Sequence, residues 1–185
     1  MTKTILIPLA PGCEELEAVT LIDLFRRAKL NVVTAGLNDG PITASRGTRL
    51  LADVTLEEVM GREFDLVALP GGLPGADHLK ADPRIREILV RTVQRGAYVA
   101  AICAAPRVLA HAGLLKGKRV TCFPGSLSRQ ELNDVTLSAD GVVQDGLVIT
   151  SKGPGTAMDF ALYLIELLTN RATRDNVESG LQRTV

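Results

Sequence analysis

Apolar runs alternate with helical patterns of apolar and polar positions along the whole chain. The short apolar runs predict strands at residues 4–9, 31–35, 65–69 and 98–102, and later at 135–138, 142–144 and 147–150. The first two of these later strands are expected to pair in a hairpin around residues 139–141. Helical spacing of apolar residues predicts helices at 14–28, 83–94, 104–112, 156–168 and 171–182, with Thr156 as the N-cap of the fourth.

This alternation is typical of βαβ units, which build a mostly parallel sheet with helices on both faces. The 185 residues contain no repeat, low-complexity tract or linker. We therefore expect one α/β domain over residues 1–185, long enough to bury a full core.

Composition narrows the class of protein. Hydrophobic residues make up 46% and charged residues 23%, which is an ordinary globular balance. Lys plus Arg equals Asp plus Glu, at 21 each, so the net charge gives no reason to expect a specific nucleic-acid site. No stretch has the length of a membrane span or the pattern of a signal peptide. Three cysteines without a CxxC spacing argue against a disulfide framework and favour the cytoplasm.

The carboxyl ends of the predicted strands lead into four segments that carry chemistry. These are residues 12–15, 70–72, Cys103 with its neighbours, and residues 122–124. In open parallel sheets ligands bind beyond the carboxyl ends of the strands. We expect the four segments to converge there as one site.

Cys103 lies where a core strand runs directly into a helix, with Ala101 and Ala105 two places on either side. Small flanking residues at such a junction are the pattern of a nucleophile elbow. The N-terminus of the following helix is expected to lower the pKa of the thiol. The alternative is a buried cysteine that acts only as a small apolar side chain.

Glu17 shares an apolar helical stripe with Leu21 and Leu24. Burial on such a stripe should raise the pKa of its carboxyl group, so that a protonated acid could hydrogen-bond a thiolate and act as general acid or base. The alternative is that Glu17, like Glu14 and Glu15, is a solvated charge that favours the helix N-terminus.

The remaining reactive side chains have simpler interpretations. His78 and His111 are expected to be surface or helix-end residues. Cys13 and Cys122 are either apolar packing residues or second oxidisable thiols near the same sheet edge. No His/Cys/Asp cluster has metal-binding spacing. Residues 71–72 and 153–155 lack the spacing of a phosphate loop and are interpreted as close backbone approaches, the former to Cys103.

Residues 12–17, 69–72, 100–106 and 151–156, taken in this order, resemble the ThiJ/PfpI superfamily. The most similar branch contains the parkinsonism-associated deglycase and bacterial YajL. The resemblance implies a flavodoxin-like three-layer sandwich, a homodimer and a nucleophilic cysteine that oxidises readily, and it implies no cofactor.

Matched motif by motif, Cys103 resembles the family nucleophile and Glu17 the acid that contacts it. The backbone amides of Gly72 and Ala104 resemble the donors to an oxyanion.

Three further residues follow from the resemblance. Arg27 and Arg46 resemble arginines near the site at the dimer interface, with solvated charges as the alternative. Phe123 occupies the position where the parkinsonism-associated deglycase has histidine. Without that histidine, a Cys-His protease or amidotransferase dyad is disfavoured.

The resemblance implies a glutathione-independent glyoxalase or deglycase that acts on methylglyoxal, glyoxal and their early adducts on proteins or nucleotides. One alternative is a non-enzymatic oxidative-stress sensor or redox-regulated chaperone that uses the same thiol. Another is a small-molecule-binding domain in which the cysteine is inert.

Overall fold

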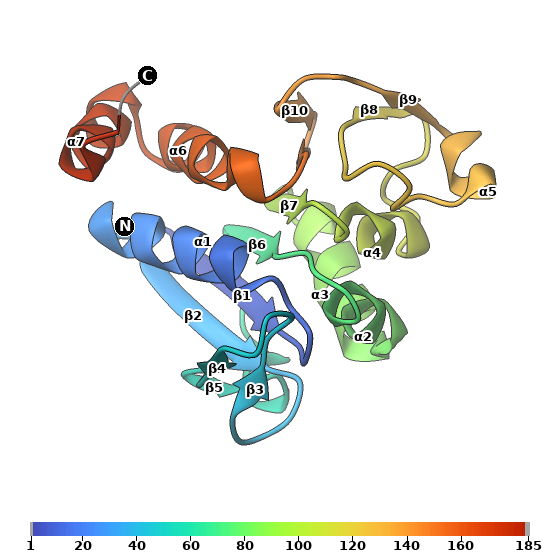
Figure 1. The fold of residues 1–185 in the computed structure, drawn as a ribbon, viewed down its shortest axis with the longest axis horizontal. Coiled ribbons are helices and arrows are strands. Elements are labelled where there is room, and N and C mark those ends of the chain that lie inside the picture. The colour runs from blue at the N-terminus through green and yellow to red at the C-terminus, as the bar shows by residue number, and fades with distance from the viewer. Residues whose placement is uncertain (1, 184–185) are drawn as a thin grey trace.

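Seven strands form the central sheet, in the order β10-β11-β7-β6-β1-β2-β5 (Figure 1). The computed structural model describes residues 2–183. Neighbouring strands are parallel throughout except for the antiparallel pair β10–β11. The strands are β1 (Thr4–Leu9), β2 (Asn31–Gly36), β3 (Ile42–Thr43), β4 (Arg49–Leu50), β5 (Val54–Thr55), β6 (Leu66–Leu69), β7 (Tyr98–Ile102), β8 (Lys118–Val120), β9 (Val135–Leu137), β10 (Val142–Asp145) and β11 (Val148–Ser151).

The helices form two groups (Figure 1), one of α1, α6 and α7 and the other of α2, α3 and α4. They cover the two faces of the sheet, which confirms the predicted flavodoxin-like α/β sandwich. Their bounds are α1 (Glu15–Arg27), α2 (Gly75–Ala81), α3 (Pro83–Gln94), α4 (Pro106–His111), α5 (Arg129–Leu132), α6 (Ala157–Leu168) and α7 (Arg171–Leu181), with short 3-10 turns η1 (Glu57–Val59) and η2 (Pro154–Thr156).

The core lies along the three central strands β1, β6 and β7. Leu6, Val67 and Ala100, one from each strand, are completely buried. Because helices cover both faces, these strands are continuously apolar and show no alternation. This is why the apolar runs of the sequence predict them well.

The predicted hairpin between residues 135–138 and 142–144 is wrong. β9 pairs in parallel with β8, while β10 pairs antiparallel with β11. The tight turn lies at Gly146, which has a φ of +63° and follows Asp145. Asp-Gly is the stronger hairpin signal, because glycine tolerates the left-handed conformation that such a turn requires. Ser138 and Asp140 instead hydrogen-bond to each other, Ser138 Oγ to Asp140 Oδ2 at 2.7 Å.

Several short elements were not predicted from the sequence, namely β3, β4, β5, β8, α2 and α5. Most span only two to four residues, too few for a periodicity to appear. Thr156 does occupy the N-cap position of α6, but its hydroxyl hydrogen-bonds Gly153 rather than a helix N–H. Of the helices between residues 2 and 183, none has the length and apolar character needed to cross a membrane.

Candidate active site

The four segments predicted to converge do meet at the carboxyl edge of the sheet. The N–H of Glu14, at the start of α1, donates to the carbonyl of Gly71 after β6, at 2.9 Å. The N–H of Phe123 donates to the carbonyl of Cys103 after β7, also at 2.9 Å. Backbone hydrogen bonds therefore join the loop after β1 to the loop after β6, and the loop after β7 to the loop after β8, while the close approach of Gly71 to Cys103 brings the two pairs together.

Cys103 adopts the strained backbone of a nucleophile elbow. Its φ is +62°, a left-handed conformation that is costly for a residue with a side chain. The N–H of Cys103 donates to the carbonyl of Ser151 on β11 at 3.0 Å, which holds the strained residue in place. The residue is 9% exposed, so small molecules have only a narrow approach to the thiol.

Two glycines allow the loop after β6 to approach Cys103. A Cβ added at Gly71 would lie 2.7 Å from Cys103 Cβ and 2.8 Å from the nitrogen of Ala104. Gly72 has a φ of +86°, and a Cβ there would collide with the backbone of Glu14. Any larger residue at either position forces the loop away from the thiol, which confirms the close approach predicted for residues 71–72.

Glu17 lies on α1 with its side chain completely buried, as the apolar stripe predicts. Its Oε2 accepts a hydrogen bond from the N–H of Gly71 at 2.8 Å. Its Oε1 is buried and has no hydrogen-bond partner among the described residues. Burial raises the pKa of Glu17 to about 7, although the Gly71 N–H and the Cys103 thiol both favour the ionised form.

The prediction of a lowered thiol pKa is wrong. Burial and the charge of the neighbouring Glu17 carboxylate raise the pKa of Cys103 to about 12. The N–H groups of Gly72 and Ala104 act in the opposite direction but do not prevail. Helix α4 contributes little because it has only six residues and begins at Pro106, which has no N–H.

Arg46 and Arg27, both predicted near the site, lie at opposite ends of α1. The loop at Arg46 is held to α1, because the Arg46 N–H donates to Glu15 Oε1 at 3.0 Å, and the Arg46 side chain is exposed. Arg27 is the last residue of α1, which places it roughly 15 Å along the helix axis from Glu17. It pairs there with Asp23 at 2.7 Å. Within one chain Arg27 is therefore distant from Glu17, and its place at a dimer interface stays a prediction.

The ring of Phe123 is 50% exposed and packs over Gly153, where an added Cβ would lie 3.4 Å from a ring carbon. Phe123 thus lies beside the elbow, as expected. Gly153 is the second predicted close approach, and it accommodates this ring.

Both histidines lie on exposed parts of helices. His78 lies on α2 with Nδ1 2.8 Å from the carbonyl oxygen of Pro11. His111 is the exposed last residue of α4. Both agree with the surface or helix-end interpretation.

The other two thiols differ from each other. Cys13 is completely buried, and burial raises its pKa to about 11, so it is a packing residue. Cys122 is half-buried next to Phe123. Across residues 2–183, no three His, Cys, Asp or Glu side chains gather in a group that could hold a metal ion.

This combination of a cysteine elbow, a buried glutamate and a glycine loop agrees with comparisons to known proteins. The model of the DJ-1/PfpI family matches residues 3–167. The chain belongs to the DJ-1/PfpI family. It is 42% identical to Protein dj-1beta of Drosophila melanogaster over 98% of this chain and 97% of that protein. It is 39% identical to the glutathione-independent glyoxalase DJR-1.2 of Caenorhabditis elegans, over 90% of this chain and 89% of the relative.

Solved structures of DJ-1/PfpI proteins have the same fold. The crystal structure of Drosophila melanogaster DJ-1beta has a TM-score of 0.95 at 41% identity, with both chains fully covered. Oxidized Toxoplasma gondii DJ-1 has a TM-score of 0.92 at 32% identity, also with full coverage of both chains. The family and fold predicted from the four motifs are confirmed.

Sequence reasoning missed two contributors to the site, both of them backbone groups. The N–H of Gly71 orients Glu17, and the carbonyl of Ser151 holds Cys103. The motifs at residues 71–72 and 151–156 indicate that these segments belong to the site. They do not indicate which backbone N–H or carbonyl makes the contact, because nearly every residue type carries the same backbone groups.

Proposed function

We propose that this DJ-1/PfpI chain is a cysteine-dependent, cofactor-independent glyoxalase or deglycase. Its substrates would be methylglyoxal, glyoxal and their early adducts on proteins or nucleotides. The observation that carries the proposal is the Glu17 carboxyl group. It is completely buried, it is oriented by the Gly71 N–H, and its second oxygen remains available beside the Cys103 thiol. The glyoxalase activity named for the Caenorhabditis relative supports the same reaction class.

The reaction begins when Cys103 Sγ adds to the aldehyde carbon of methylglyoxal. The new C–S bond leaves an alkoxide, for which the N–H groups of Gly72 and Ala104 are the donors. Glu17, which has taken up the thiol proton, protonates the alkoxide to give a hemithioacetal and becomes a carboxylate again. The Glu17 carboxylate then removes the C–H proton from that carbon and returns it to the neighbouring carbon through an ene-diol, which yields the thioester of lactate. Water hydrolyses the thioester and regenerates the thiol.

This sequence needs no external oxidant or reductant. The aldehyde carbon is oxidised to the level of an acid while the ketone carbon is reduced to an alcohol, and one water is consumed overall. The groups required are one nucleophile, one acid–base group and donors to the alkoxide, all of which the site supplies.

The proton that Cys103 must lose has a nearby acceptor. Burial raises the pKa of Glu17 to about 7, so its carboxylate is a stronger proton acceptor than an ordinary one. Part of the rise in the Cys103 pKa comes from the charge of Glu17 and therefore requires Glu17 to be ionised. Transfer of the thiol proton to Glu17 removes that part, and leaves the thiolate facing a neutral acid and the N–H groups of Gly72 and Ala104.

The test is lactate production from methylglyoxal by purified protein. We expect Cys103→Ser and Glu17→Gln each to abolish turnover while the circular dichroism spectrum remains that of wild type. Cys122→Ser is the matched control, since Cys122 is a half-buried thiol next to the site with no role in the mechanism. Turnover that persists in Cys103→Ser or Glu17→Gln overturns the mechanism.

A redox sensor or redox-regulated chaperone is the second candidate. The oxidized form of the Toxoplasma relative supports it, because that structure belongs to the same fold. In this function the Cys103 proton passes to Glu17 and the resulting thiolate reacts first, so graded peroxide followed by mass spectrometry should place the first oxygen atoms on Cys103. Oxidation of Cys13 or Cys122 before Cys103 removes the basis for this function.

A homodimer is the assembly we propose. Leu16 and Val19 on α1 and Met158 on the neighbouring α6 are large apolar side chains between 44% and 50% exposed. Clustered exposed apolar residues are typical of interaction surfaces. Light scattering should give twice the mass of one chain, and a monomer at micromolar concentration contradicts this assembly.

A further inference from the structure

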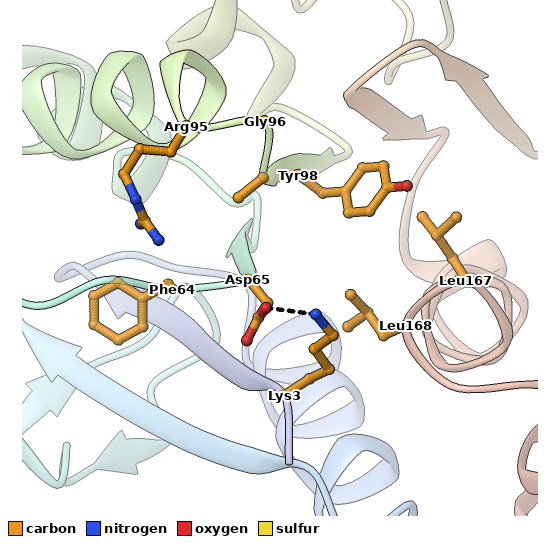
Figure 2. Close-up of a pocket in the computed structure, with 9 residues that line it drawn as sticks. Lys3, Phe64, Asp65, Arg95, Gly96, Tyr98, Leu167 and Leu168 are labelled. Atoms are coloured by element: carbon orange, nitrogen blue, oxygen red, sulfur yellow. Dashed lines mark hydrogen bonds and ion pairs between the residues drawn. The ribbon is translucent and has the colours of Figure 1, made fainter. Parts of the chain in front are cut away.

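A cavity of about 350 Å³ opens at the amino edge of the sheet, the edge opposite Cys103 (Figure 2). It lies where β1, β6 and β7 begin and where α6 ends. Lys3 and Asp65 precede β1 and β6, Arg95 precedes β7, and Leu167 and Leu168 close α6. Among the described residues that line this amino-edge cavity, none belongs to the proposed reaction.

The charged groups of the amino-edge cavity have more free donors than free acceptors. Asp65 Oδ1 accepts from Lys3 Nζ at 2.8 Å, and Asp65 Oδ2 accepts from the N–H of Thr4 at 2.9 Å. Both oxygens of this carboxylate are therefore occupied. A lysine ammonium carries three N–H donors and a guanidinium carries five. Lys3 and Arg95 thus retain donors after their pairing with Asp65 and with Glu63, the latter at 2.8 Å.

The Arg95–Glu63 pair is easily exchanged. The Glu63 side chain is 67% exposed, and such surface ion pairs are held by only about 0–1 kcal/mol. A ligand carboxylate that binds Arg95 bidentately therefore displaces Glu63 at small cost. The Lys3 ammonium lies within the cavity beside Asp65 (Figure 2) and offers its remaining donors to the same ligand.

The larger uncharged side chains that line the amino-edge cavity are aromatic or aliphatic. Phe64 is almost fully buried, and Tyr98, Leu167 and Leu168 are half-buried. Figure 2 shows Leu167 and Leu168 on one side of the Lys3–Asp65 pair, and Phe64 and Arg95 on the other. A ligand that reaches the cations therefore places its remaining atoms against the Tyr98 ring and the two leucine side chains.

We propose that the amino-edge cavity binds a small monocarboxylate with an aromatic or branched apolar body. A single negative charge satisfies the free donors of Lys3 and Arg95. A dianion such as phosphate is disfavoured because Asp65 and Glu63 lie close and repel the additional charge. A neutral apolar molecule would desolvate the cations without pairing them. The site is independent of the proposed reaction at Cys103.

Titration calorimetry of the full chain with phenylacetate tests this proposal, with the uncharged isostere phenylacetamide as the control ligand. We expect saturable binding of phenylacetate and at least tenfold weaker binding of phenylacetamide. Arg95→Gln and Lys3→Gln should each weaken phenylacetate binding about tenfold through loss of one charge-assisted contact. Arg86→Gln is the matched control variant, because Arg86 is an exposed arginine on α3 that does not line the cavity. Cys103→Ser should bind as wild type does.

Leucine-methyl NMR of the wild-type chain gives a second readout that needs no variant. The Leu167 and Leu168 methyl resonances should shift with phenylacetate and saturate at the calorimetric affinity. Absence of binding, equal binding of phenylacetamide, equal loss in Arg86→Gln, or loss of binding in Cys103→Ser overturns the proposal. Lactate production is a separate assay that tests only the proposed function. The binding proposal and the proposed function can therefore fail independently.

Discussion

Replacing Glu17 by glutamine should remove a specific pH dependence from the stability of the chain. Glu17 is completely buried, and burial raises the pKa of its carboxyl group from the ordinary 4.5 to about 7. A raised pKa in the folded state means that folded chains hold the proton where unfolded chains have lost it. The stability contribution is therefore intact below pH 4.5 and is lost as the pH rises to about 7.

The size of this loss follows from the two values. Each tenfold change in proton affinity corresponds to about 1.4 kcal/mol, so a rise from 4.5 to about 7 corresponds to about 3 kcal/mol of unfolding free energy. No solvent screening reduces this figure, because the side chain has no exposed surface. Glutamine retains a carbonyl oxygen for the Gly71 N–H but carries no titrating proton.

Urea unfolding at a series of pH values from about 4.5 to about 8 measures the effect. We expect wild type to lose about 3 kcal/mol across this range relative to Glu17→Gln. Glu87→Gln is the control, because Glu87 is a 63% exposed residue of α3. Carboxylates with lowered pKa, such as Asp82, lose their contribution below this range and do not interfere. A difference between wild type and Glu17→Gln that does not change with pH refutes the reasoning.

Three further predictions concern the frame around the site. Gly71→Ala should lower the unfolding free energy by about 1–3 kcal/mol, since its Cβ would lie 2.7 Å from a neighbouring Cβ, whereas Gly155→Ala has open space and should change it by less than about 0.5 kcal/mol. Equal effects in urea unfolding contradict this. Asn170→Ala should cost about 1 kcal/mol, seen as a lower melting temperature, because the Asn170 side chain caps α7; an unchanged melting temperature would show that the cap is dispensable. Iodoacetamide at neutral pH should leave Cys13 unmodified while Cys122 reacts, since only Cys122 is partly exposed; peptide mass spectrometry reports the order, and earlier labelling of Cys13 is inconsistent with its burial.

The parts of the fold that the sequence predicts well are those in which local pattern and burial coincide. The central strands are apolar on both faces, and Cys103 has small neighbours on each side of a strand-to-helix junction. Both features are encoded by residues close together in the chain. The stripe that carries Glu17 is likewise local, because helical spacing alone places it with Leu21 and Leu24.

The errors arise where the outcome depends on distant segments. The helix that follows Cys103 predicts a lowered thiol pKa, but burial and the nearby Glu17 carboxylate raise it. The partner of residues 135–137 is β8, a three-residue strand too short to recognise beforehand. The predicted role of Arg27 depends on a second chain, because the length of α1 carries it away from Glu17 within its own chain.

The loop after β6 has a consequence for how this chain tolerates mutation. Gly71 donates its N–H to Glu17 and its backbone lies against Cys103, so the placement of the acid beside the thiol rests on backbone atoms and not on the rotamer of a third side chain. Surface positions can therefore change widely without altering the reacting geometry. Single changes at Gly71 or Gly72 cannot be compensated by a neighbouring side chain, because the atoms in the way belong largely to the backbone. In saturation mutagenesis, almost every substitution at Gly71 and Gly72 should therefore abolish function, whereas most substitutions at exposed positions should be tolerated.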